Sequence, residues 1–230
     1  GVKSSISKFV SENKFKELID AIGAKTGDAV LLAAGPWLKL SWAMGALRLD
    51  VARRLNLIDN NQAAWCWIVD YPMYEAVEEG TLAAKQGKTV DFGHNPFSMP
   101  QGGLEALTSK DPLDILAYQY DLVLNGFEIS SGAVRNQNPE LMYKAFAIAG
   151  YSKEDVDKKF GAMIQAFNYG APPHAGNAPG LDRLSMVLND WDSIRDMYAF
   201  PKDGQGRDVL MDSPSEVSPE QLREIGIKME

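Results

Sequence analysis

Cysteine and histidine are the scarcest reactive residues in this sequence of 230 residues, which has one of the first and two of the second. Cys66 stands alone, so neither a disulfide framework nor a multi-cysteine zinc site can form, and a reducing, cytoplasmic setting is expected. No Cys-His pair, plausible Ser-His-Asp set or phosphate loop ending in Gly-Lys-Ser/Thr is present. Covalent catalysis and the usual NTPase cradle therefore have no support.

Long hydrophobic runs and basic clusters are also missing. No apolar stretch approaches the roughly 20 residues that span a bilayer, and the N-terminus lacks a secretory pattern, so no membrane partner is expected. The formal net charge is -8. Because affinity for a phosphate backbone needs clustered Lys and Arg, this chain alone is not expected to bind nucleic acid strongly. Contact with RNA through a larger assembly stays open.

What is present is enough apolar sequence for a sizeable core. Hydrophobic residues make up 45% of the chain, which predicts one large domain or one domain with a small appendage. The chain begins with Gly1 rather than methionine, which is typical of an expression remnant or of a piece cut from a longer protein. A polar break at residues 59–61 predicts two units, residues 1–60 and 61–230.

Hydrophobic spacing predicts a compact α/β segment in the first unit. Its expected elements are a helix over residues 12–22 between the N-cap Ser11 and Gly23, a buried strand over 29–34, and a helix from Pro36 to about Leu55.

In the second unit, runs of β-prone residues come first. Segments with helix N-cap residues and an apolar stripe at helical spacing follow. The early elements expected are a buried strand at 65–69, a long functional loop at 80–104, and a hairpin of 120–124 and 127–129 around Asn125-Gly126. The later ones are a helix from Asn138-Pro139 to near Gly150, a helix with the capping box Ser152 and Asp155 and the stripe Val156, Phe160, Met163, Ile164 and Phe167, and a short helix capped by Ser218 and Gln221.

A glycine- and proline-rich loop at residues 170–184 leads to Arg183 and to a helix start at 184–188. Gly176 and Gly180 let the main chain approach a flat ligand closely, and an arginine near a helix N-terminus is placed to meet phosphate. The arrangement favours a nucleotide as the ligand. A Gly/Pro loop before an ordinary core helix, with a surface arginine, fits the spacing equally well.

Asp121, Glu128 and Arg135 follow one another at intervals of seven residues. In an ideal strand an odd separation puts side chains on opposite faces, so the three share a site only if a bulge or turn resets the alternation. Gly126 and Gly132 are placed to do so. Two carboxylates can then hold Mg²⁺ with phosphate oxygens, and Arg135 can bind a carboxylate through a bidentate fork. A surface ion-pair ladder on a hairpin is the alternative.

The two histidines lie in expected loops. His94, followed by Asn-Pro-Phe, can serve as a hydrogen-bond donor or cation for an acidic substrate, or be merely exposed. His174, which follows two prolines, is expected to brace its loop.

Five motifs in order resemble the C-terminal part of a bacterial-type aspartyl-tRNA synthetase, a class II synthetase, and the match covers nearly the whole chain. They are WIVDYPMYE at 67–75, HNPF at 94–97, YDLVLNGFE at 120–128, PPHAG at 172–176 with GLDR at 180–183, and the flank SIRD at 193–196 with AFPK at 199–202. The resemblance implies an α+β fold with an antiparallel class II sheet and flanking helices. Residues 1–60 resemble the latter half of the family's insertion domain, a partial α/β domain.

The resemblance implies ATP-dependent activation of L-aspartate: the substrate carboxylate attacks the α-phosphorus, pyrophosphate leaves, and the aspartyl group later passes to tRNA. The protein supplies position and charge, with no catalytic nucleophile. His94 and Arg135 would recognise aspartate, Arg135 taking its side-chain carboxylate. The implied ATP-binding residues are Glu128, Gly180, Leu181, Asp182 and Arg183, and the implied Mg²⁺ ligands are Asp121 and Glu128.

Four positions depart from the family's pattern: Asn95 replaces a second histidine, Ser130 and Ser131 replace glycines, and Pro179 replaces an apolar residue. Each touches the expected pocket, so they reflect either drift or altered substrate handling. Nothing resembles the family's first motif, which builds the dimer interface, its second, which supplies the arginine on the α-phosphate, or its anticodon-binding barrel.

We therefore expect a fragment of a homodimeric enzyme, inactive alone. A non-catalytic synthetase-like binding or regulatory module is one alternative. A ligase that activates another acidic metabolite is the other.

Overall fold

The chain divides into two compact units, residues 1–62 and residues 63–230. The computed structural model describes residues 2–59 and 61–228. Each unit is described by itself.

Two helices form the described part of the first unit. Helix α1 spans Glu12–Ile22; the Ser11 hydroxyl caps its start by accepting from the Lys14 amide, and Gly23 ends it at a φ of 65°. A left-handed φ is one that glycine adopts without steric cost, which is why the helix stops there. Helix α2 spans Trp37–Arg54 and begins after Pro36. Both predicted helices are confirmed.

The prediction of a buried strand at residues 29–34 is wrong. These residues belong to no helix or strand, and all six are exposed. A strand needs a neighbour to satisfy its backbone groups, and the described part of the first unit contains no other strand. The described residues of this unit are therefore helical rather than α/β, and among them Phe15 alone is buried.

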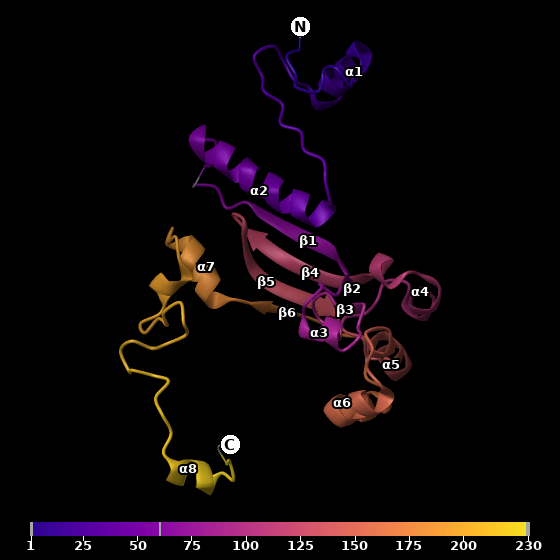
Figure 1. Cartoon of the computed structure of the whole chain (residues 1–230), viewed down its shortest axis with the longest axis vertical. Helices are drawn as coiled ribbons and strands as arrows, with labels where there is room; N and C mark the ends of the chain where they lie inside the picture. Colours follow the sequence, from indigo (N-terminus) through magenta and orange to yellow (C-terminus); the bar gives the residue numbers. More distant parts are fainter. Residues whose placement is uncertain (1, 60, 229–230) are drawn as a thin grey trace. The chain divides into compact units, whose positions relative to one another are not determined.

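An antiparallel sheet of four strands organises the second unit, which confirms the predicted fold class (Figure 1). The strand order is β1-β4-β5-β6, and every pairing is antiparallel. The strands are β1 (Trp65–Pro72), β4 (Leu116–Leu124), β5 (Phe127–Val134) and β6 (Ala175–Pro179). A second, two-stranded sheet pairs β2 (Tyr74–Ala76) with β3 (Val90–Phe92).

Strand β1 forms where it was predicted, but it is not buried. Trp65 and Trp67 are 51% and 56% exposed, and Val69 is 56% exposed. The strand lies at the edge of the sheet and pairs with β4 alone. An apolar run shows that a segment has surface to bury, whereas burial itself depends on what packs against it.

The long loop expected at residues 80–104 is only partly a loop. It contains helix α3 (Leu82–Lys85), whose start Thr81 caps, as well as strand β3 and the beginning of helix α4 (Gly103–Ser109). A short 3₁₀ turn, Pro112–Asp114, then leads into β4. These elements are too short to show hydrophobic periodicity, which explains why the sequence did not reveal them.

Helices α5 and α6 share one buried core cluster of this unit, and both match the prediction. Helix α5 spans Pro139–Ile148 after the N-cap Asn138. Helix α6 spans Lys153–Phe167, and the Ser152–Asp155 capping box is present. On α6 the predicted stripe faces the core: Val156 and Ile164 are buried, and Phe160, Met163 and Phe167 pack against the same cluster.

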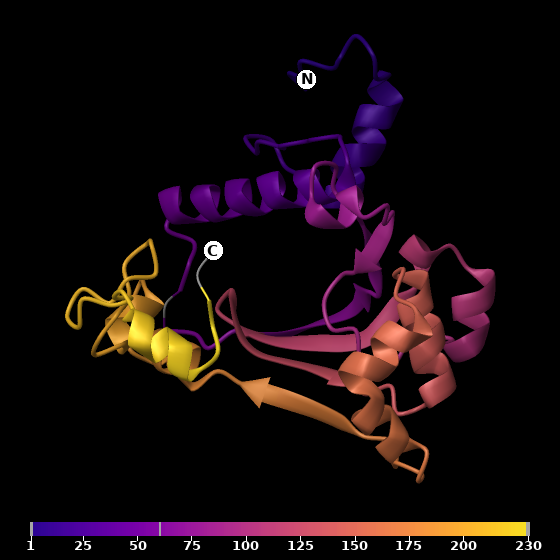
Figure 2. The same cartoon turned by 60° about the horizontal axis from the view of Figure 1, so that its bottom comes forward.

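Strand β6 replaces the loop that the glycine- and proline-rich segment predicted. It pairs with β5 from Val134↔Ala175 to Ser130↔Pro179. The residues of this segment have weak β-propensity, so the sequence does not predict this long-range pairing. Figure 2 shows β6 running from the α5 and α6 end of the unit to helix α7 (Leu181–Leu188).

The C-terminal part contains a 3₁₀ turn, Ile194–Met197, and helix α8 (Pro219–Glu224), with the predicted capping box of Ser218 and Gln221. Throughout residues 2–59 and 61–228, no helix combines the length and apolar character needed to cross a membrane.

Candidate functional site

A cavity of about 1080 Å³ lies on one face of the four-stranded sheet. Its lining comes from all four strands and from the loop at residues 94–97. Four of the predicted site residues line it: His94, Asp121, Glu128 and Arg135. The sequence placed them in three different segments, and the sheet brings them together.

A two-residue turn sets the faces of Asp121 and Glu128. Asn125 and Gly126 have φ values of 50° and 86° and connect Leu124 directly to its partner Phe127. Glu128 then stands opposite Val123, which shares a face with Asp121 because the two are separated by two residues. The prediction that Gly126 resets the alternation of side chains between the two faces is therefore confirmed.

Arg135 reaches the same face through a bulge that is not at Gly132. The β4–β5 register shifts between Leu122, which opposes Ser130, and Val123, which opposes Glu128. Ile129 is thereby left without a partner on β4. Because this extra residue interrupts the alternation of side chains, Glu128 and Arg135 lie on the same face although they are an odd number of residues apart. The expectation that Gly132 resets the alternation is wrong.

Gly132 has a different task, which is to let β6 and Tyr120 come close. A Cβ at this position would collide with the Gly176 carbonyl oxygen and with the Tyr120 ring. Only a residue without a side chain leaves room for both neighbours. The Tyr120 hydroxyl also donates to the Gly176 carbonyl oxygen at 3.0 Å, which ties the same three segments together.

Tyr71 lines the cavity, although sequence reasoning missed it. The β1–β4 register shifts between Val69, which opposes Tyr120, and Tyr71, which opposes Ala117. This shift turns Tyr71 from the face of Tyr120 to the face of Asp121. Asp70, between them, has a φ of 61°, a conformation that Asp tolerates better than most residues. The only signal in the sequence was the Asp-Tyr-Pro end of the strand.

Asp121 accepts a hydrogen bond from the Tyr71 hydroxyl. Burial, and then this hydrogen bond and the negative charges of Asp121 and Glu128, raise the pKa of Tyr71 above its usual range. The phenol therefore stays protonated and donates to the carboxylate throughout the neutral range.

Arg135 presents an unneutralised guanidinium to the cavity. The ion pairs formed by the described residues do not include it. Its Cζ atom lies 5.4 Å from the centroid of the Phe97 ring, a cation–π contact. Its backbone amide donates to the His174 carbonyl oxygen at 2.9 Å. His174 is not among the residues that line the cavity, and its contact with Arg135 is through the backbone.

Arg183 lies beside the cavity rather than in its lining. Its Nη1 atom is 3.1 Å from Glu128 Oε1 and donates to the Glu128 carbonyl oxygen at 2.9 Å. The Gly180 amide donates to the Ile129 carbonyl oxygen at 2.7 Å, which attaches the start of α7 to β5. Leu181 is 73% exposed, and Asp182 accepts from the Tyr198 hydroxyl at 3.0 Å. None of the residues 180–183 lines the cavity itself.

His94 is exposed in the loop after β3, and its ring meets the Tyr71 ring edge to face, with centroids 5.0 Å apart. The next residue, Asn95, folds back on its own loop: its Oδ1 atom accepts from the Phe97 amide at 2.9 Å.

Of the four departures from the family pattern, Asn95 and Ser131 line the cavity. Ser130 is buried against Asn177, and Pro179 is its partner on β6, so neither lines it.

A magnesium ion fits this site only with help from a ligand. In the part of the chain that the structure describes, no three His, Cys, Asp or Glu side chains are grouped to hold a metal. Asp121 and Glu128 line the same cavity, and each has one oxygen engaged, by Tyr71 and by Arg183. Because Mg²⁺ is bound through one or two carboxylates plus substrate phosphates and waters, the pair suits an ion carried by a nucleotide.

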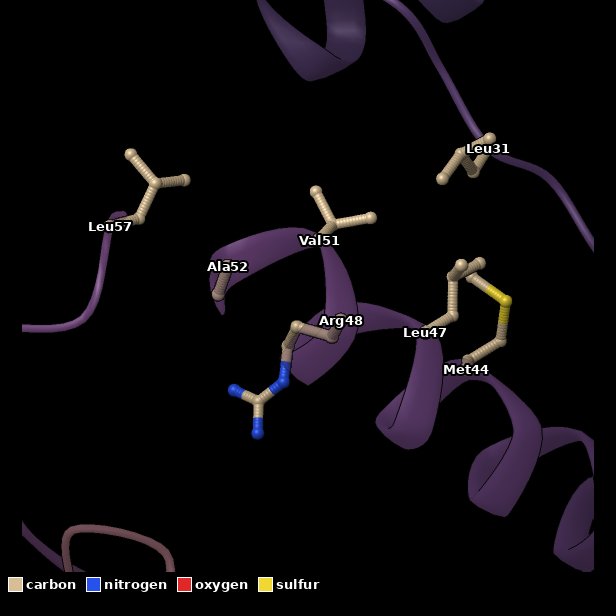
Figure 3. Close-up of a pocket in the computed structure, with 7 residues that line it drawn as sticks. All are labelled: Leu31, Met44, Leu47, Arg48, Val51, Ala52 and Leu57. Carbon is tan, nitrogen blue, oxygen red and sulfur yellow. The ribbon is translucent and has the colours of Figure 1, made fainter. Parts of the chain in front are cut away.

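The first unit has a smaller cavity of about 260 Å³ between α2 and the segments around Leu31 and Leu57 (Figure 3). Its other lining residues are Met44, Leu47, Arg48, Val51 and Ala52. Arg48 is the only charged side chain among them. An apolar lining with a single cation offers neither an acid–base pair nor a nucleophile, so we assign no chemistry to it.

Comparison with known proteins shows the family. Residues 5–204 match the family model of the class II tRNA synthetases for D, K and N, and the chain belongs to this family. It is 53% identical over 230 residues to an aspartate–tRNA(Asp/Asn) ligase of Pelodictyon phaeoclathratiforme and to one of Chlorobium phaeovibrioides. All of the chain aligns, and it spans 37% of the length of each relative.

Among solved structures, aspartyl-tRNA synthetase from Entamoeba histolytica matches with 22% identity and a TM-score of 0.44, covering 85% of this chain and 32% of that one. Asparaginyl-tRNA synthetase from Pyrococcus horikoshii matches with 16% identity and a TM-score of 0.43, covering 84% of this chain and 34% of that one.

Proposed function

We propose that this chain contributes the aspartate- and ATP-binding surface of an aspartyl-tRNA synthetase, which activates L-aspartate with ATP and transfers it to tRNA. The observation that carries the proposal is the convergence of Asp121, Glu128, Arg135 and His94 on one cavity. Membership of the class II family and 53% identity to two aspartate–tRNA(Asp/Asn) ligases support the reaction class. The expected homodimer and cytoplasmic location belong to the same proposal.

Arg135 and His94 form the aspartate side of the proposed site. The planar guanidinium of Arg135 can bind the side-chain carboxylate through two parallel hydrogen bonds. A neutral amide in its place would leave a desolvated guanidinium underpaired, at a cost of about 1–3 kcal/mol, so the pocket should favour aspartate over asparagine. His94 adds a donor or a cation at the rim, where its exposed position lets it move toward a ligand.

Asp121, Glu128 and residues 180–183 form the proposed nucleotide side. The two carboxylates would hold Mg²⁺, which supplies charge neutralisation for the phosphates when it is bound. Arg183 is already anchored to Glu128 at the start of α7. The planar face of its guanidinium can stack on adenine, or its remaining N–H groups can pair with the γ-phosphate.

Positioning is the chain's contribution to the chemistry. The α-carboxylate of aspartate is the nucleophile, the α-phosphorus is attacked, and pyrophosphate leaves with the electron pair of the broken bond. Arg135 fixes the amino acid, and the carboxylate pair and Arg183 fix the nucleotide, so that the two reacting groups meet in one orientation. No side chain of the cavity needs to become covalently modified.

Calorimetric titration of the chain tests the proposal. We expect Mg·ATP and L-aspartate to bind, asparagine to bind at least about tenfold more weakly than aspartate, and Arg135→Ala to remove aspartate binding while sparing Mg·ATP. Arg223→Ala, on the exposed helix α8, is the matched control and should change neither affinity. Equal affinity for aspartate and asparagine would contradict the proposed specificity. Because the α-phosphate arginine is not among the cavity residues, aspartate-dependent ATP–pyrophosphate exchange by the chain alone should be absent.

A further inference from the structure

Tyr71 stands where the two halves of the proposed site meet. Its hydroxyl donates to Asp121 Oδ2, and its ring meets the His94 ring edge to face at a centroid distance of 5.0 Å and an angle of 89°. Asp121 belongs to the nucleotide side of the cavity and His94 to the aspartate side. One side chain therefore contacts a group on each side.

The hydroxyl restricts the Asp121 carboxylate. Within residues 2–59 and 61–228, the bond from Tyr71 is the only hydrogen bond that this carboxylate accepts. A carboxylate with one oxygen fixed cannot rotate freely, so its other oxygen keeps a constant direction. Hydrogen bonds of this kind to metal-binding carboxylates set both the geometry and the affinity of a site.

The ring restricts His94 in a different way. His94 lies on an exposed loop, and its packing against Tyr71 is the only aromatic contact of this imidazole among the described residues. An edge-to-face pair has a preferred geometry and adds stabilisation beyond that of the area it buries. The contact therefore favours one orientation of an exposed side chain.

The register shift at Asp70 is what makes both contacts possible. Without it, Tyr71 would share the opposite face of the sheet with Tyr120. The backbone thus adopts an uncommon φ of 61° at a non-glycine residue, and the result is a phenol in the cavity.

We propose that Tyr71 is a positioning residue for both ligands, with its hydroxyl orienting Asp121 toward Mg·ATP and its ring orienting His94 toward aspartate. The inference rests on the proposed function and deepens it, because it makes one side chain responsible for two separable affinities.

Two substitutions separate the two roles. Tyr71→Phe keeps the ring and removes the hydroxyl, so the dissociation constant for Mg·ATP should rise roughly tenfold. Binding of ATP in EDTA and of aspartate should stay at the wild-type values. Tyr71→Leu removes the ring as well, and the dissociation constant for aspartate should then also rise, by about fivefold. Calorimetry on the 230-residue chain measures all three affinities.

Tyr118→Phe is the control, because Tyr118 is 48% exposed and its hydroxyl makes no hydrogen bond to the described residues. It should leave every affinity unchanged. A Tyr71→Phe variant that weakens ATP equally with and without Mg²⁺, or that leaves Mg·ATP binding unchanged, would overturn the inference while the proposed function stands. A wild-type chain that binds neither ligand would overturn the proposed function and the inference with it. Thermal unfolding of each variant confirms that the folded protein is being compared.

Discussion

Arg183 binds Glu128 twice, through its backbone carbonyl oxygen at 2.9 Å and through its carboxylate at 3.1 Å. The two residues lie 55 positions apart, so this contact joins the first turn of α7 to strand β5. Both side chains are nearly half exposed, at 45% and 47%. The contact therefore contributes more to placing the guanidinium than to stability, since exposed ion pairs are worth about 0–1 kcal/mol.

Arg183→Ala should accordingly separate binding from folding. We expect Mg·ATP affinity to fall at least about tenfold, because the proposed contact of Arg183 with the nucleotide is lost, while the free energy of unfolding falls by about 1 kcal/mol or less. Arg183→Lys should restore little, since an ammonium cannot bind carbonyl, carboxylate and ligand in one plane. Calorimetry and urea unfolding give the two quantities. Arg207→Ala, at an ion pair outside the proposed site, is the control, and equal losses of ATP affinity in both variants would count against a role for Arg183.

Gly132→Ala should destabilise the second unit. A methyl group there meets the Gly176 carbonyl oxygen and the Tyr120 ring, so β6 or the ring must move, at a cost of about 1–3 kcal/mol. Gly161→Ala is the matched control in helix α6, where an added Cβ meets nothing within 4 Å. That change should stabilise the protein by about 0.5–1 kcal/mol. Similar effects of the two alanines in thermal unfolding would contradict the close approach of β6.

Asp155 should titrate below its usual range in the intact capping box. The hydrogen bond from the Ser152 hydroxyl, followed by that from the Ser152 amide, lowers the pKa of Asp155. A lowered folded-state pKa means that the contribution to stability is present above the pKa of the unfolded chain and is lost as the pH falls through the folded value. Ser152→Ala should raise the pKa of Asp155 toward the ordinary value. Carboxyl ¹³C shifts followed against pH measure it, and an unchanged titration would show that the capping box does not hold the charge.

The two units should differ in hydrogen exchange. Among its described residues the first unit buries only Phe15, and no residue of α2 is buried, whereas α5 and α6 share a packed cluster. Amides protected by few buried contacts open at low free-energy cost. We expect the amides of α2 to exchange orders of magnitude faster than those of α6. Equal protection of the two helices, measured by mass spectrometry on the isolated chain, would show that α2 is stabilised in a way its burial does not reveal.

The sequence predicted the elements whose structure is determined by residues close to them in the chain. The caps Ser11, Asn138 and Ser152 and the turn Asn125-Gly126 act through neighbours within a few residues, so their helices and hairpin were predictable. Strand β6 was not, because Ala175–Pro179 becomes a strand only by pairing with β5. The strand expected at 29–34 failed for the converse reason: its residues are apolar, but the described unit offers no strand to pair with.

The same distinction applies to the candidate site. The motifs named four residues that prove to line one cavity, but of the features that put Asp121, Glu128 and Arg135 on one face only the Asn125-Gly126 turn was predictable. The register shift at Ile129, which brings Arg135 to that face, and the shift at Asp70, which brings Tyr71 there, occur at residues that do not signal a bulge. Tyr71 was missed for this reason, since strict alternation from Trp67 assigns it to the wrong side of the sheet.

Ile129 is the residue by which β5 exceeds the length that β4 requires. Deleting it would restore unbroken alternation and still leave Glu128 and Arg135 pointing the same way. The carbonyl oxygen that receives the Gly180 amide would disappear with it. A variant without Ile129 would thus keep its charged groups on one face. It would lose the hydrogen bond that attaches the start of α7 to β5 beside them.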